Sequence, residues 1–81
     1  MKTTYRIFKL TERSDGVLDQ ESVHLFESAD PDEVIEKYEN LVKSKKSFYD
    51  VYTIVEYRFN PKRGTFRTRE IVLEDLERVS R

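Results

Sequence analysis

The chain has no cysteine and no tryptophan, and only two glycines and two prolines among its 81 residues. Without cysteine it can form neither disulfides nor thiolate metal sites. Gly16 and Gly64 both fall in predicted turns, so no glycine-rich loop is present to cradle a phosphate. No apolar run approaches the roughly 20 residues of a membrane span, and Arg6 and Lys9 interrupt any leader-like start. We therefore expect a cytoplasmic protein that does not enter a membrane.

Groups that carry catalysis or bind metals are also scarce. His24 is the only histidine, and with no cysteine or second histidine to join it we expect a partly buried strand residue. The serines have no nearby base to activate them. The acid pairs Asp32/Glu33 and Glu74/Asp75 suit helix capping and solvation and do not match a calcium-loop spacing. The sequence therefore predicts a protein that is not an enzyme and that binds no metal or other cofactor.

The most strongly patterned stretch, residues 48–59, consists almost entirely of β-branched and aromatic residues. Large apolar groups occupy both alternating sets of positions, a pattern typical of a central strand that is covered on both faces. Its odd-numbered members are Tyr49, Val51, Thr53, Val55, Tyr57 and Phe59, and its even-numbered ones include Phe48, Tyr52 and Ile54.

Two further strands are expected before this one, over residues 3–12 and 21–28. Asp15-Gly16 between them is a tight-turn signal, because both central residues of a type I′ turn need positive φ. The connection is either a two-residue turn at this dipeptide or a longer loop reaching Gln20. The choice matters because a shift of one residue would exchange the two faces of a strand.

A helix is predicted over residues 31–46. Asp30 suits the N-cap, Pro31 the first helical position, and Glu33 completes a capping box. Lysines at the end of this range suit the negative end of the helix dipole. One apolar stripe is expected to face the sheet: Val34, Ile35, Tyr38, Leu41 and Val42.

The rest of the chain reads as a hairpin and a short tail. Asn60-Pro61-Lys62-Arg63-Gly64 has the residues of a tight connection, leading to a fourth strand over about 65–72. Leu73, Leu76 and Val79 recur at a spacing that fits a short C-terminal helix.

The order ββαββ indicates a single α+β domain, residues 1–81, in which a four-stranded antiparallel sheet carries one amphipathic helix on one face. The other face must be covered by the C-terminal tail or by a second copy of the sheet.

Charge is segregated along the chain although the net charge is only −1. Acids dominate residues 12–39, whereas bases dominate the hairpin. The bases predicted to bind a partner are Arg58, Lys62, Arg63, Arg67 and Arg69. The alternative is an edge hairpin kept soluble by its charge. A strand of twelve residues extends roughly 40 Å, well beyond a 16-residue helix of roughly 24 Å, so the hairpin should overhang the core.

Two further expectations concern the bases of the hairpin and the tyrosines of the β-forming stretch. Arg58 is expected to reach the acidic start of the helix within its own subunit, whereas Lys62 and Arg63 lie too far out. Tyr49, Tyr52 and Tyr57 could stack nucleic-acid bases, although core tyrosines with a solvated hydroxyl are the favoured interpretation.

These features favour a small protein–protein interaction or regulatory module that is not an enzyme. We expect a homodimer formed through the second sheet face or a strand edge, with another protein as partner. The alternative is a nucleic-acid-binding protein that uses the basic hairpin, residues 57–69.

Overall fold

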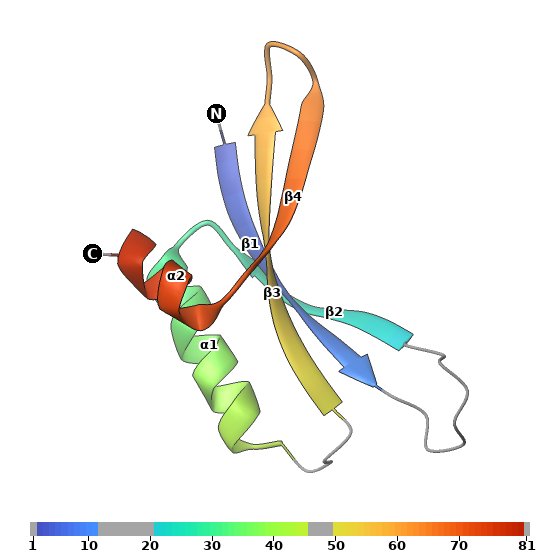
Figure 1. Cartoon of the computed structure of the whole chain (residues 1–81), viewed down its shortest axis with the longest axis vertical. Coiled ribbons are helices and arrows are strands. Elements are labelled where there is room, and N and C mark those ends of the chain that lie inside the picture. The colour runs from blue at the N-terminus through green and yellow to red at the C-terminus, as the bar shows by residue number, and fades with distance from the viewer. Residues whose placement is uncertain (1, 12–20, 46–49, 81) are drawn as a thin grey trace.

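The computed structural model describes residues 2–11, 21–45 and 50–80, which form one sheet and two helices (Figure 1). The strands are β1 (Lys2–Thr11), β2 (Glu21–Ser28), β3 (Asp50–Asn60) and β4 (Thr65–Ile71). The helices are α1 (Pro31–Lys43) and α2 (Leu73–Val79). All strand pairs are antiparallel, in the order β2-β1-β3-β4. The predicted α+β class is confirmed. The Asp15-Gly16 turn, Lys46, Phe48 and Tyr49 lie outside the described residues.

The register of the sheet shows which side chains share a face. Ile7 lies opposite Ile54, and Ile54 lies opposite Ile71, so these three residues project from the same side. The register between β1 and β2, which the sequence left open, places Phe26 opposite Ile7. It then shifts between Ile7 and Phe8, as at a β-bulge, so that His24 lies opposite Phe8.

Helix α1 begins where its capping residues predict. Asp30 is extended (φ −92°, ψ 113°), and its carboxylate accepts a 3.0 Å hydrogen bond from the backbone N–H of Asp32. The capping box is completed indirectly: the Ser28 hydroxyl donates to Glu33 at 2.8 Å and accepts from the Asp30 N–H at 3.0 Å. The first turn therefore satisfies its exposed donors with nearby side chains.

The end of α1 and one edge of its stripe differ from the prediction. The helix ends at Lys43, where the hydrogen-bond pattern changes: the Ser44 N–H still donates to the Asn40 carbonyl at 3.0 Å, but the Lys45 N–H donates to the Val42 carbonyl at 3.4 Å. The Ser44 hydroxyl also donates to the Asn40 carbonyl, at 2.9 Å. Lys45 therefore follows the helix instead of forming its last turn. Val42 is 46% exposed and lies outside the apolar stripe.

The core lies between the sheet and both helices. Tyr5, Ile7, Ile54 and Ile71 from the sheet pack with Val34 of α1 and Leu76 of α2. Figure 1 shows the two helices side by side on the same side of the sheet. The C-terminal helix therefore does not cover the second face. β3 is central, as predicted, but the helices of the described residues cover only one of its two sides.

The β3–β4 hairpin extends past both helices (Figure 1). We call residues 57–69 the arm. Its turn is closed by a 2.8 Å hydrogen bond from the Gly64 N–H to the Asn60 carbonyl, and the Asn60 side chain accepts from the Lys62 N–H at 3.1 Å. Gly64 has φ +63°, a conformation that residues other than glycine rarely adopt.

Among the described helices, none is long and apolar enough to cross a membrane.

Candidate interaction surfaces

The arginines of the arm gather on the side of the sheet that carries the helices. Arg58 lies directly opposite Arg67, and Glu56 lies directly opposite Arg69. Glu56 is buried on the helix side, and residues two apart on a strand share a face. Arg58, Arg67 and Arg69 therefore project from the same face as Glu56.

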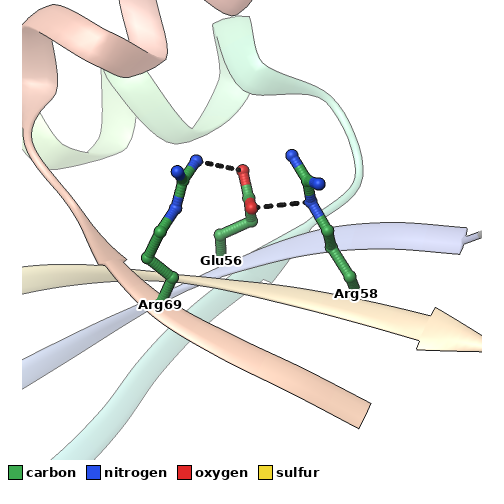
Figure 2. Close-up of polar contacts among 3 residues, drawn as sticks. All are labelled: Glu56, Arg58 and Arg69. Atoms are coloured by element: carbon green, nitrogen blue, oxygen red, sulfur yellow. Dashed lines mark hydrogen bonds and ion pairs between the residues drawn. The ribbon is translucent and has the colours of Figure 1, made fainter. Parts of the chain in front are cut away.

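Glu56 is a buried carboxylate held between two of these arginines. Figure 2 shows its side chain between Arg58 and Arg69, beneath the helices. One oxygen lies 2.8 Å from Arg58 Nε, and the other lies 3.5 Å from a terminal nitrogen of Arg69. The side chain of Glu56 is only 4% exposed, whereas those of Arg58 and Arg69 are 51% and 63% exposed. The cluster thus combines one desolvated anion with two largely solvated cations.

This difference in exposure determines how the contact contributes to the stability of the fold. A buried carboxylate without a partner is strongly destabilising, so the arginines offset the cost of burying Glu56. The guanidiniums themselves lose little hydration because more than half of each remains exposed. The two arginines therefore allow Glu56 to be buried, and Glu56 in turn fixes the orientation of the two arginines.

The pKa of the Tyr5 phenol depends on the charges of the same cluster. It is 4% exposed and lies directly opposite Glu56. Burial raises the pKa of its phenol above the ordinary 10.0, and the negative charge of Glu56 raises it further. Arg58 and Arg69 act in the opposite direction and lower that pKa in part. The phenol therefore stays neutral well into alkaline pH.

Two hollows flank the Arg58–Arg67 pair. The outer hollow, about 240 Å³, is lined by that pair together with Asn60, Arg63 and Thr65. The inner hollow, about 310 Å³, is lined by the same pair with Glu56, Thr68 and Arg69. Guanidinium groups present rigid sets of N–H donors that match carboxylate and phosphate oxygens. Both hollows are therefore suited to an oxyanion.

The structure brings four of the five predicted partner-binding bases to these hollows. Arg58, Arg63, Arg67 and Arg69 line one or both, whereas Lys62 at the turn lines neither. The expectation that Arg58 reaches the acidic start of α1 is wrong. It forms an ion pair with Glu56 of its own strand instead, because side chains two residues apart on β3 project from the same face.

Glu56 was missed as a site residue when the sequence was considered alone. A signal was present: it shares the even-numbered positions of β3 with Ile54, so a carboxylate follows the core residue on the covered face. An acid in that position needs cations, and arginine stands two residues later.

The second surface is the side of the sheet away from the helices. We call it the open face and define it by its large apolar side chains: Phe8, Leu10, Val51, Val55, Tyr57, Phe59 and Phe66. Val51 is 54% exposed and Phe66 is 67% exposed. The rings of Phe59 and Phe66 lie 4.8 Å apart, next to each other across β3 and β4.

Polar groups on the open face are largely engaged within the chain. The Arg6 guanidinium lies 4.1 Å from the centre of the Tyr57 ring, and its Nε lies 3.2 Å from Glu27. This ion pair lacks hydrogen-bond geometry, which leaves the Arg6 Nε without a hydrogen bond among the described residues. The Thr53 hydroxyl donates to Glu70 at 2.9 Å. The face thus mixes apolar side chains with polar ones, and Lys2 and Glu70 on it form no ion pair among the described residues.

His24 differs from its predicted role, and Tyr52 and Tyr57 do not form the base-stacking surface that was the alternative for the tyrosines. His24 is exposed, not partly buried: its Nε2 lies 3.1 Å from the Phe26 carbonyl oxygen, and its ring centre lies 5.3 Å from that of Phe8. It is exposed because β2 is an edge strand and the open face is uncovered. Tyr52 and Tyr57, five residues apart on β3, project from opposite faces and form no common stacking surface.

Across residues 2–11, 21–45 and 50–80, no group of three or more acidic or histidine side chains is placed to hold a metal ion. Comparison of the chain with protein-family models, curated proteins and solved structures finds no significant match.

Proposed function

We propose that the protein is a non-enzymatic interaction module that acts as a homodimer, with the open face as the contact between the two copies. The observation that supports this most directly is the placement of both helices on one face. Neither helix covers the apolar side chains of the other face. Each large apolar side chain left in water forfeits roughly 1.5–3 kcal/mol of burial.

The size of the open face is sufficient for a stable dimer. β1 and β3 contain 10 and 11 residues, so the face is roughly 33 Å long. Four strands at a spacing of about 4.8 Å give a width of about 19 Å. Each copy would contribute roughly 600 Å² and the pair roughly 1,200 Å², at the lower end of specific interfaces.

A second copy suits this face better than an unrelated surface. Two such faces can pack about 10 Å apart as in a β-sandwich, each side filling the gaps of the other. A two-fold axis makes the contact self-complementary. The formal net charge of −1 produces little repulsion between copies, and Arg6 is already paired with Glu27.

Sedimentation equilibrium of the chain and two matched variants tests the dimer. Val51 on the open face and Val42 on α1 are 54% and 46% exposed, so a glutamate at either position disturbs the folded monomer little. We expect the unmodified chain and Val42→Glu to sediment at twice 9.8 kDa at micromolar concentration. Val51→Glu should weaken association by about tenfold or more, because its charge would be buried without a partner.

A monomer for the unmodified chain would contradict the proposal, as would an equal effect of the two glutamates. Circular dichroism of each variant separates loss of association from loss of folding.

The arm supplies the surface for a further partner, which we propose is another protein. Nucleic acid is the second candidate, because a two-stranded ribbon can enter a major groove. A mobility-shift assay across salt distinguishes them, since phosphate contacts make affinity fall steeply with ionic strength. No shift at roughly 50 mM salt, with DNA or RNA of either strandedness, would remove the second candidate. The cytoplasmic location expected from the sequence stays a prediction.

A further inference from the structure

We infer that the arm binds an extended acidic peptide in which two carboxylates are separated by one residue, one seated in each hollow. This rests on the proposed interaction function but does not require the dimer. Three features support it: the spacing of the hollows, the arginines that line them and the chemistry of the surrounding face.

The spacing follows from the strand register. On the helix side of the arm, Asn60 pairs with Thr65, Arg58 with Arg67, and Glu56 with Arg69. Successive rows are two residues apart, or roughly 6.6 Å. The outer hollow lies between the first and second rows, and the inner hollow between the second and third. Side chains that alternate along an extended peptide have the same separation.

The arginines retain donors for an incoming anion. Among the described residues, Arg63 and Arg67 form no ion pair, and Arg58 and Arg69 each contact Glu56 through one nitrogen. Each guanidinium carries five N–H donors. Arg58 and Arg67 also lie directly opposite each other, an arrangement of like charges that is unfavourable until an anion joins them.

Glu56 shows that this set of arginines accepts a carboxylate. Its oxygens lie between Arg58 and Arg69 (Figure 2). Glu56 also lines the inner hollow. A peptide carboxylate between Arg58 and Arg67 would repeat this contact one row further out. The outer hollow adds the amide of Asn60 and the hydroxyl of Thr65, which can donate to a second carboxylate.

The same face is poorly suited to nucleic acid. Single-stranded binders stack bases on aromatic rings. Phe59 and Phe66, the aromatic pair of the arm, lie on the open face, away from the arginines. A long polyanion would also meet the acids that begin α1, whereas a short peptide confined to the arm would not.

Fluorescence anisotropy with a labelled Gly/Ser peptide that contains one Glu-Ser-Glu sequence tests the inference, in roughly 50 mM salt. We expect saturable binding, and no binding of the Gln-Ser-Gln version. Arg67→Gln should weaken binding by about tenfold or more, since charge-assisted hydrogen bonds to both carboxylates are lost. Lys62→Gln is the matched control: it removes the same charge from the same arm but lines neither hollow. It should change affinity by less than about threefold.

Equal losses for Lys62→Gln and Arg67→Gln would overturn the inference, because they would indicate a general charge effect without a built site. Absence of saturable binding to the Glu-Ser-Glu peptide would overturn it too, as would tighter binding of an oligonucleotide of equal charge. Sedimentation of the same samples reports the dimer independently, so failure of the peptide site is distinguishable from failure of the open-face contact.

Discussion

At the scale of single residues, Glu56 determines the character of the covered face. It follows the core residue Ile54 on the covered side of β3, and among the described residues its carboxylate forms ion pairs with Arg58 and Arg69. A charge in this position stabilises little by itself, because its desolvation costs about as much as the pairing returns. What it supplies is orientation: two flexible side chains are held over the inner hollow.

Charge-removing variants of this cluster should be unequal in their effect. Glu56→Gln should lower the free energy of unfolding by only about 1 kcal/mol, because the exposed guanidiniums regain water. Replacing both Arg58 and Arg69 by glutamine should cost about 3 kcal/mol, because the buried carboxylate loses its partners. Urea unfolding at neutral pH measures both. Arg67 has no ion pair among the described residues, so Arg67→Gln is the control and should leave the free energy of unfolding nearly unchanged. The reverse order would mean that Glu56 is solvated.

At the scale of elements, α1 is the part of the fold most completely determined by local chemistry. Its start has an N-cap, a proline and a relayed capping box, and its C-cap is Ser44. Its attachment to the sheet depends on a narrow stripe, since Val34 is fully buried while Val42 is nearly half exposed.

The two valines of α1 offer a matched test of that facing. Val34→Ala should cost about 2 kcal/mol through a cavity under the helix. Val42→Ala should stay within about 0.5 kcal/mol, because it removes little buried surface. Asp30→Ala should cost about 1 kcal/mol by removing the cap. Thermal and urea unfolding report all three. Equal costs for the two valines would show that the helix is rotated relative to the sheet.

At the scale of the whole molecule, the chain is thin and elongated, with extents of 45 × 27 × 17 Å. Figure 1, viewed along the shortest dimension, shows the helices beside the sheet, so the two layers stack across the intermediate dimension. The arm extends past the helices, and Tyr57, Phe59 and Phe66 of the open face belong to it as well (Figure 1). The two proposed contacts use opposite sides of the sheet, so the contacts can be altered separately.

Reversal of the tip charges should separate binding from folding. Lys62→Glu with Arg63→Glu should leave the melting temperature within about 2 °C of the unmodified chain, because exposed charges contribute little to stability. It should weaken binding of the acidic peptide and reduce the salt dependence of that binding. Lys37→Glu with Lys43→Glu produces the same change of net charge on α1 and should leave peptide binding nearly unchanged. Loss of folding in the tip variant would show that the turn is structural.

The sequence by itself determined the order and boundaries of most elements. Helix capping at Asp30, the turn at Asn60–Gly64 and the β-forming run that contains β3 all depend on residues close together in the chain. Such interactions are readable without tertiary contacts. The basic character of the arm was readable for the same reason, because charge is a property of composition.

Only the tertiary structure decided which side of each strand is covered and which side of the sheet each helix packs on. Alternation places Ile54 and Val55 on opposite sides, but the covered side is set by pairing with β1, whose residues lie about fifty positions earlier. The same long-range pairing buries Glu56 beside Tyr5 and brings Arg58 opposite Arg67. α2 could equally have covered the second face; it joined α1 because Leu76 and Val34 complete one core. The open face is the consequence of that choice.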